Sequence, residues 1–170
     1  ASDRRAHRTS RRARHHTRSS TDDWMKPMHD HHVRQIEEIR QVLNRYARAV
    51  DTHDWDLYRS LFTEDATLDY TSVPFGIRGS REEIVEWLSD SLPLMAMTMH
   101  YITNVEAHFD EDTAAVRAQF YNPMQFPGST ELSSCGGYYH HEMVRTPDGW
   151  RSRNLREENV WFVNPPGLAD

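Results

Sequence analysis

The 170-residue chain contains a single cysteine, Cys135, and no run of eighteen apolar residues. One cysteine excludes an internal disulfide and any metal site that is built from several thiolates. A helix that crosses a membrane needs about 20 consecutive apolar residues, so the sequence predicts no membrane span. Because disulfides are absent, we expect a protein of the reducing cytoplasm.

Residues 1–23 lack any apolar periodicity and contain seven Arg and three Asp among many Ser, Thr and His residues. Such a segment cannot bury enough apolar surface to fold. We therefore predict that residues 1–23 form a disordered Arg/His-rich extension and that residues 24–170 form one domain. No apolar stretch follows the arginines, so the sequence does not predict an export signal.

Residues 24–170 hold only 13 of the 20 basic residues but 23 of the 26 acidic ones. A domain this acidic is unsuited to a phosphate backbone, and we expect no nucleic-acid partner. Five Trp, seven Tyr and six Phe supply large apolar side chains, several with polar tips. These residues favour a core that encloses a pocket for a small apolar molecule.

The order of the predicted elements indicates an α+β fold. Apolar residues at steps of three and four predict a helix over residues 30–52. A short helix follows over residues 54–62, and a third begins at Ser80, where Glu83 completes a capping box, and ends near Pro93. Alternating patterns predict strands over residues 66–71, 101–109, 113–126, 137–145 and 150–162. Helices that precede an antiparallel sheet are typical of α+β domains.

Two polar residues lie near the end of the first predicted helix. Tyr46 falls within the apolar stripe and Asp51 on its margin, so a phenol and a carboxylate could border one cavity. The alternative is that Tyr46 is a core tyrosine and Asp51 caps a turn. His100, which precedes the first long strand, is likewise either a catalytic residue or a capping or core histidine.

Several motifs resemble the SnoaL-like branch of the nuclear transport factor 2-like superfamily over residues 33–162. They are Arg45-Tyr46 followed by Asp51 and Asp54, Leu61-Phe62-Thr63-Glu64-Asp65-Ala66, Gly79 at a helix start, His100-Tyr101-Ile102-Thr103-Asn104 and Asp148-Gly149-Trp150-Arg151. The resemblance implies a cone-shaped α+β barrel, with three N-terminal helices packed on a curved, mainly antiparallel sheet around a deep pocket.

The resemblance also implies a set of catalytic residues. Scytalone dehydratase and the bile-acid 7α-dehydratases use a tyrosine, an aspartate and a histidine, and Tyr46, Asp51 and His100 match that trio. The implied function is a dehydratase or isomerase that works by acid/base chemistry on an apolar, cyclic, hydroxylated carbonyl compound, without a metal or another cofactor. Whether Tyr46 or His100 is the base stays open.

Other activities of the superfamily are alternatives. Limonene epoxide hydrolase uses an Arg-x-Asp motif on a strand, and the corresponding place here reads Arg117-Ala118-Gln119, without the carboxylate. A polyketide cyclase-like enzyme would need Gln119 or Tyr121 in place of a strand aspartate. A non-catalytic binding module and a structural subunit of the same fold also remain possible.

The expected lining of the pocket comprises the apolar residues Tyr70, Phe75, Trp87 and Phe120 and the polar residue Asn122. Relatives with the trio form trimers and other members of the fold form dimers, so we expect a homo-oligomer, with a trimer favoured over a dimer. Such an assembly would cover aromatic residues on the outer face of the sheet, for which the sequence suggests Tyr139, Trp150 and Trp161.

Overall fold

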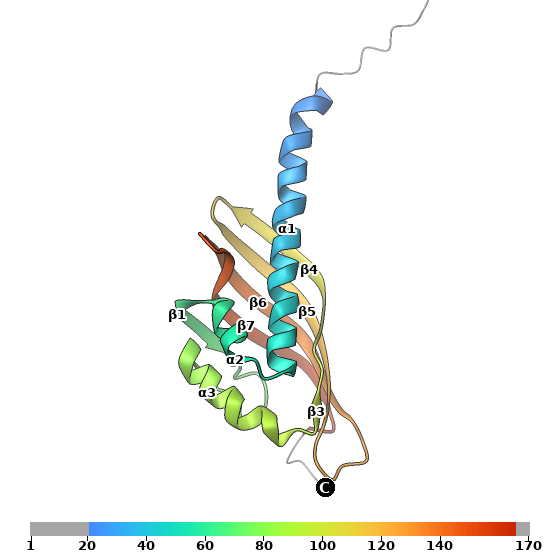
Figure 1. Cartoon of the computed structure of the whole chain (residues 1–170). Helices are drawn as coiled ribbons and strands as arrows, with labels where there is room; N and C mark the ends of the chain where they lie inside the picture. The colour runs from blue at the N-terminus through green and yellow to red at the C-terminus, as the bar shows by residue number, and fades with distance from the viewer. Residues whose placement is uncertain (1–20, 166–170) are drawn as a thin grey trace, which may run out of the picture. The chain divides into compact units, whose positions relative to one another are not determined.

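The computed structural model describes the backbone of residues 21–165 and the side chains of residues 31–165. The elements are α1 (Thr21–Asp51), α2 (Trp55–Ser60), β1 (Phe62–Asp69), β2 (Arg78–Ser80), α3 (Arg81–Ser91), a 3-10 turn η1 (Leu92–Leu94), β3 (Met97–Thr98), β4 (Tyr101–Asp110), β5 (Thr113–Gln125), β6 (Ser133–Thr146) and β7 (Gly149–Val163) (Figure 1). Most of the expected extension, residues 1–20, lies outside the described residues, and residues 21–23 belong to α1.

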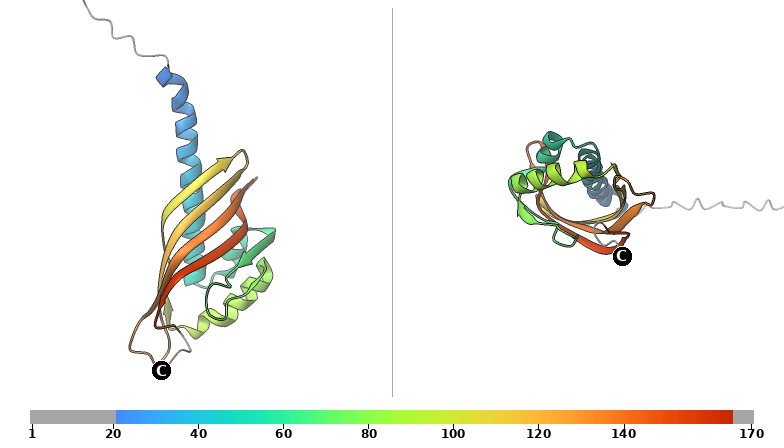
Figure 2. Two further views of the ribbon diagram at one scale, coloured as in Figure 1. Left: turned by 180° about the vertical axis from the view of Figure 1, so that it is seen from behind. Right: turned by 90° about the horizontal axis from the view of Figure 1, so that it is seen from below.

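Seven strands form one sheet in the order β2-β1-β7-β6-β5-β3, and β4 also pairs with β5. All pairs are antiparallel except β1 with β7, which is parallel. The sheet curls strongly, and the helices pack on its concave side (Figure 2). This arrangement confirms the predicted α+β cone. Among the described residues, no helix is both long and apolar enough to span a membrane.

The core lies on the concave face of the sheet because strand side chains alternate between its two faces. In β5 the even-numbered residues from Ala114 to Met124 are buried, and the odd-numbered ones from Thr113 to Tyr121 are exposed. On α1, Ile39, Leu43, Tyr46 and Val50 are buried as their spacing predicted.

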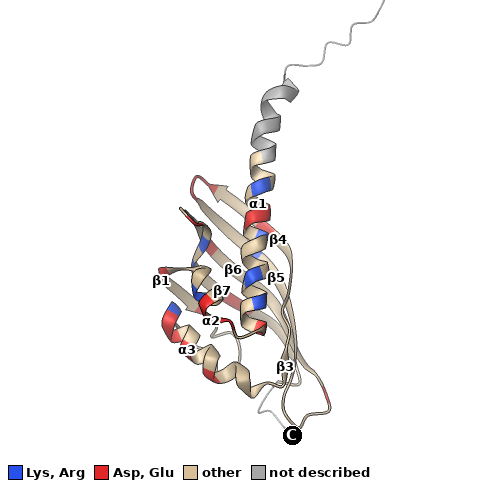
Figure 3. Ribbon diagram, viewed as in Figure 1, with Lys and Arg blue, Asp and Glu red and all other residues tan. Residues whose placement is uncertain are grey.

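Both predicted helix caps are present. Asp54 accepts a hydrogen bond from the backbone N–H of Leu57 at the start of α2, and Ser80 and Glu83 form the capping box of α3. Acidic residues lie in the first turns of α2 and α3, where they complement the positive end of the helix dipole (Figure 3).

The structure corrects several sequence predictions. The second helix ends at Ser60, and the first strand begins at Phe62 instead of Ala66. Tyr139 and Trp150, expected on the outer face, are only 2% and 3% exposed. Tyr139 faces the concave side, and Trp150 packs against Phe109 beneath the Arg145 guanidinium. Trp161 is exposed, as expected, and stacks on Tyr121.

Leu155 lies fully buried in the core on β7, whereas Leu132 is 53% exposed. Leu155→Ala removes apolar contacts and leaves a cavity, so we expect it to lower the free energy of unfolding by about 2–5 kcal/mol. Leu132→Ala, the matched control, should change it by less than about 0.5 kcal/mol. Urea unfolding measures both values, and equal losses would contradict the assignment of Leu155 to the core.

Candidate active site

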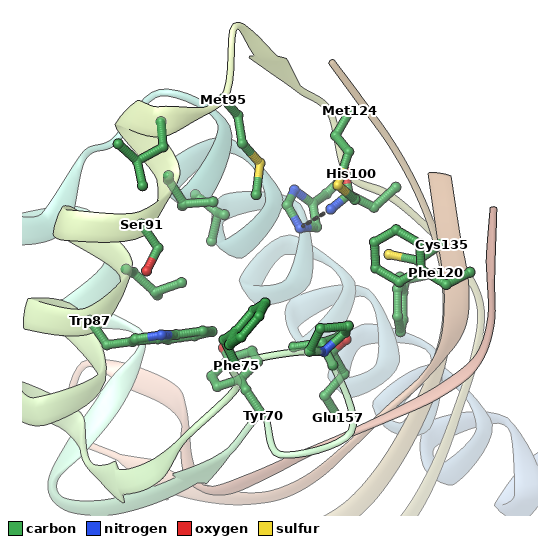
Figure 4. Close-up of a pocket in the computed structure, with 18 of the residues that line it drawn as sticks. Tyr70, Phe75, Trp87, Ser91, Met95, His100, Phe120, Met124, Cys135 and Glu157 are labelled. Atoms are coloured by element: carbon green, nitrogen blue, oxygen red, sulfur yellow. Dashed lines mark hydrogen bonds between the residues drawn. The ribbon is translucent and has the colours of Figure 1, made fainter. Parts of the chain in front are cut away.

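A cavity of about 380 Å³ lies between α1, α3 and the concave face of the sheet (Figure 4). Its lining is mainly apolar and includes every residue that the sequence suggested for this role, namely Tyr70, Phe75, Trp87, Phe120 and Asn122. Tyr46 and His100 also reach the cavity. An apolar cavity with a few polar groups has the general form of a small-molecule site.

Asp51, the last residue of α1, holds His100 at the entrance to β4. The two carboxylate oxygens accept two hydrogen bonds, Oδ1 from Nδ1 of the ring at 2.6 Å and Oδ2 from the backbone N–H of His100 at 2.9 Å. A carboxylate only accepts, so Nδ1 carries the hydrogen. The side chains of His100 and Asp51 are 7% and 20% exposed. Nε2 is therefore the ring nitrogen that can exchange a proton with a ligand.

Asn122, on β5, lies beside the second ring nitrogen of His100. Its amide oxygen accepts from Nε2 at 3.1 Å when its nitrogen points to the carbonyl oxygens of Met99 and Pro123, each 3.1 Å away. This orientation suits a protonated ring. With the amide turned the other way, Nδ2 donates to Nε2 of a neutral ring at 3.1 Å. In that second orientation the amide oxygen faces the carbonyl oxygens of Met99 and Pro123, so the first orientation satisfies more hydrogen-bonding groups.

Three tyrosine hydroxyls form a chain at the base of the cavity. The Tyr70 hydroxyl lies 2.8 Å from that of Tyr46 and 2.8 Å from that of Tyr58. Burial raises the pKa of each of these phenols above its usual value of about 10. They therefore remain protonated hydrogen-bond donors at neutral pH. The sequence pointed to Tyr46 and Tyr70 separately, but it did not indicate Tyr58 or the chain.

His141 is a second histidine on the concave side, packed edge-on against Tyr46 and Tyr139. Its Nδ1 lies 3.0 Å from the Ser152 hydroxyl. Desolvation lowers the pKa of His141 to about 3, so the ring is neutral and a weak base. It does not line the cavity. These properties distinguish a structural core histidine from His100.

Glu157, on β7, is a polar group of the cavity that the sequence did not reveal. Its residue is 7% exposed, and burial raises the pKa of its carboxyl to about 8. Among the described residues, the Asn159 side chain is the one that stabilises the ionised form of Glu157 and so lowers its pKa. However, the Nδ2 atom of Asn159 makes no hydrogen bond of normal geometry. The carboxyl is therefore mainly protonated at neutral pH.

The orientation of Glu157 depends on irregularities in the pairing of β6 with β7. The register shifts between Glu142 and Met143 and again between Gly136 and Gly137. At Gly137 the strands approach so closely that a Cβ atom would lie 1.9 Å from the carbonyl oxygen of Glu158. Simple alternation across such shifts does not predict which side chains face inward.

The strand residues that an epoxide hydrolase or a polyketide cyclase-like enzyme would use face away from the cavity. Arg117, Gln119 and Tyr121 belong to the exposed side of β5, and Arg117 lies over the Tyr138 ring at 3.8 Å. Among the residues with described side chains, no three His, Cys, Asp or Glu residues cluster as metal ligands. The sequence also contains a histidine-rich run, His29-Asp30-His31-His32, part of which lies outside that set.

Residues 31–156 match the family model of the SnoaL-like domain. The chain belongs to the SnoaL-like family. An uncharacterized relative from Mycobacterium tuberculosis, Rv2910c, is 39% identical over 115 residues, which span 67% of this chain and 78% of the relative. The match to the family model covers most of the residues that the structure of this SnoaL-like protein describes.

Solved structures share the fold. A putative aromatic ring hydroxylase from Novosphingobium aromaticivorans superposes with a TM-score of 0.70 at 26% identity, over 77% of this chain and 93% of its own. A putative scytalone dehydratase from the same organism gives 0.71 at 19% identity, over 83% of this chain and 99% of its own. The hexachlorocyclohexane dehydrochlorinase LinA-type3 from Novosphingobium barchaimii gives 0.65 at 17% identity, over 79% and 92%.

The protonated state of Glu157 predicts how stability depends on pH. Between about pH 4.5, the pKa of an exposed Glu, and about 8, the folded protein keeps a proton that the unfolded chain has lost. The stability that this proton contributes is complete below pH 4.5 and is lost as the pH rises through 8. Relative to Glu157→Gln, we expect the free energy of unfolding to fall by up to about 1.4 kcal/mol per pH unit in this window.

Urea unfolding at several pH values measures this slope. Glu158→Gln is the matched control, because Glu158 neighbours Glu157 but pairs with His140 and Arg156 on the other face. Its curve should run parallel to that of the wild type. A Glu157→Gln curve that is also parallel would show that the carboxyl is ionised in the folded protein.

Proposed function

We propose that this SnoaL-like protein is a cofactor-independent lyase that removes water from an apolar, cyclic, hydroxylated carbonyl compound. The observation that carries the proposal is the contact between Asp51 and His100, 2.6 Å long, in the wall of an apolar cavity. A histidine held by a carboxylate is a proton-transfer unit, and the cavity provides a dry site for a ligand.

The loss of water next to a carbonyl group requires a base for the α-proton and a proton for the departing hydroxyl. His100 takes the α-proton through Nε2, since Asp51 occupies Nδ1. A histidine can act first as a base and then as an acid near neutral pH. The protonated ring then returns the proton to the hydroxyl, which leaves as water while the double bond forms.

Asp51 and Asn122 are positioning residues in this scheme. Asp51 holds the ring by its Nδ1 and by the backbone N–H, so the tautomer and the place of His100 are set together. It also stabilises the imidazolium that forms. Asn122 contacts Nε2 through its amide, 3.1 Å away, and so helps to hold the plane of the ring.

Tyr46 supplies the hydrogen bond to the carbonyl oxygen of the substrate. Tyr46 lines the cavity, and its hydroxyl contacts that of Tyr70, which in turn contacts that of Tyr58. A chain of hydroxyls polarises its terminal donor. Such a donor stabilises the negative charge that develops on the oxygen when the α-proton is removed.

Two structural neighbours support elimination chemistry by their names, a putative scytalone dehydratase and a hexachlorocyclohexane dehydrochlorinase. Both names describe the removal of a small molecule from adjacent carbons. At 19% and 17% identity the neighbours establish the fold alone, so the support for an elimination here comes from the His100 site. An isomerase would use the same base and return the proton to another carbon.

The second candidate is a binding module of the same fold without catalysis. It is favoured by one observation, that both ring nitrogens of His100 already have partners within the protein. A structural histidine would show the same pattern. A screen of cyclic β-hydroxy ketones for loss of water, followed by ultraviolet absorption of the conjugated product, distinguishes the two candidates.

With a substrate from that screen, His100→Ala should lower kcat by about 10²–10⁴-fold, because the proton-transfer group is lost. Asp51→Asn should lower kcat strongly with little change in KM, since it disturbs the tautomer rather than the pocket. The double variant should be no slower than His100→Ala alone, because the two residues act as one unit. Steady-state kinetics measures each value.

His108→Ala is the control, since His108 is an exposed histidine of β4. Its kinetics should match those of the wild type. Near-normal activity in His100→Ala would exclude His100 as the base and leave Tyr46 as the candidate. An absence of turnover across the screen would favour the binding module.

Tyr46→Phe removes one hydroxyl from the cavity and keeps the shape of the ring. We expect kcat to fall by about 10²–10³-fold, as for other donors to a developing oxyanion. KM should change little, because the donor acts mainly on the transition state. Kinetics with the same substrate checks this, and a change in KM alone would assign Tyr46 to ligand binding only.

A further inference from the structure

Glu157 is the buried acidic group of the cavity that the proposed mechanism does not use. It enters from β7, whereas His100 enters from the segment before β4, and the two reach different sides of the cavity (Figure 4). A carboxyl group in an apolar site is costly to bury without a hydrogen-bond partner. Because Glu157 lines the cavity, a ligand bound there can supply such a partner.

The surroundings of Glu157 favour the neutral acid. Its cross-strand partner is Tyr139, and the other titratable groups that it influences are Tyr46 on α1, Tyr58 on α2 and Cys135 on β6. Burial raises the pKa of all three phenols and raises that of the Cys135 thiol to about 12. These groups are uncharged at neutral pH, so none of them stabilises or further destabilises a carboxylate there.

We propose that Glu157 is a ligand-binding residue that, as a neutral carboxylic acid, donates a hydrogen bond to an uncharged oxygen of the ligand. A protonated carboxyl has one O–H donor, and an ionised one has none. The site therefore takes apolar ligands with an acceptor oxygen, such as a ketone, on the Glu157 side. The inference rests on the proposed function only for the location of the ligand and does not require turnover.

The first test establishes the protonation state without any ligand. An infrared difference spectrum between the wild type and Glu157→Gln at neutral pH should contain the carbonyl band of a protonated carboxyl. The band should disappear as the pH rises beyond the raised pKa of about 8. Carboxylate bands in its place at neutral pH would overturn the proposal.

The second test compares two probes of nearly the same shape, the ketone 1-tetralone and the hydrocarbon tetralin. Calorimetry gives the ratio of their affinities, which reports the hydrogen bond to the oxygen. Glu157→Leu removes the donor, and we expect the preference for the ketone to fall by about 3- to 10-fold. Glu157→Gln keeps a donor on its amide, so the preference should persist at neutral pH.

The pH dependence of the preference identifies the donor. In the wild type it should decline as the pH rises beyond about 8, because the carboxylate cannot donate. In Glu157→Gln it should stay constant, since an amide does not titrate. Glu158→Gln, altered on the opposite face of the same strand, should behave as the wild type.

Three outcomes would overturn the proposal: an unchanged preference in Glu157→Leu, its loss in Tyr46→Phe instead, or failure of both probes to bind the wild type. His100→Ala should keep the ketone preference. If no substrate is ever turned over but Glu157→Leu loses the preference, the proposed lyase function fails while the role of Glu157 stands. If turnover is found and Glu157→Leu keeps the preference, the proposed role of Glu157 fails while the lyase function stands.

Discussion

The carboxylate of Asp51 joins the end of α1 to the start of β4. It accepts one hydrogen bond from the backbone and one from the ring of His100, a residue 49 positions away in the sequence. The contact with the backbone N–H fixes the position of the His100 backbone, and the contact with the ring fixes the orientation of its side chain. The Asn122 contact and the approach of Tyr46 both depend on this placement of His100.

Desolvation is the physical effect that gives the polar groups of the cavity their properties. It keeps the phenols of Tyr46, Tyr58 and Tyr70 protonated and raises the pKa of Glu157 to about 8. The same effect lowers the pKa of His141 to about 3. Burial disfavours the charged form of every group, so acids become donors and the fully enclosed histidine becomes inert.

These polar groups lower the stability of the fold in exchange for a usable site. An apolar residue in place of Glu157 would avoid the free-energy cost of burying a carboxyl group. The Nε2 atom of the buried His141 also lacks a hydrogen-bond partner. The surrounding core, with Ile39, Leu68 and Leu155 fully buried, offsets these costs. An apolar cavity with a few polar groups inside a well-packed core is typical of a site that is built for a ligand.

Local patterns in the sequence determined much of the fold and part of the site. The spacing of Ile39, Leu43, Tyr46 and Val50 predicted the buried face of α1, and Ser80 with Glu83 predicted the start of α3. Such signals are local, since a cap and an apolar stripe depend on residues within two turns. The family resemblance, rather than any local pattern, brought Asp51 and His100 into one hypothesis.

Only the tertiary structure decided the rest, because it depends on strand register. The shifts at Gly136/Gly137 and Glu142/Met143 turn Glu157 on β7 toward the cavity. Tyr139, which the sequence had suggested for the outer face, is buried by the unbroken alternation of β6. A shift of one residue moves a strand's side chains to the opposite face of the sheet. The contacts of Tyr70 with Tyr46 and Tyr58 join three separate elements, and no spacing in the chain encodes them.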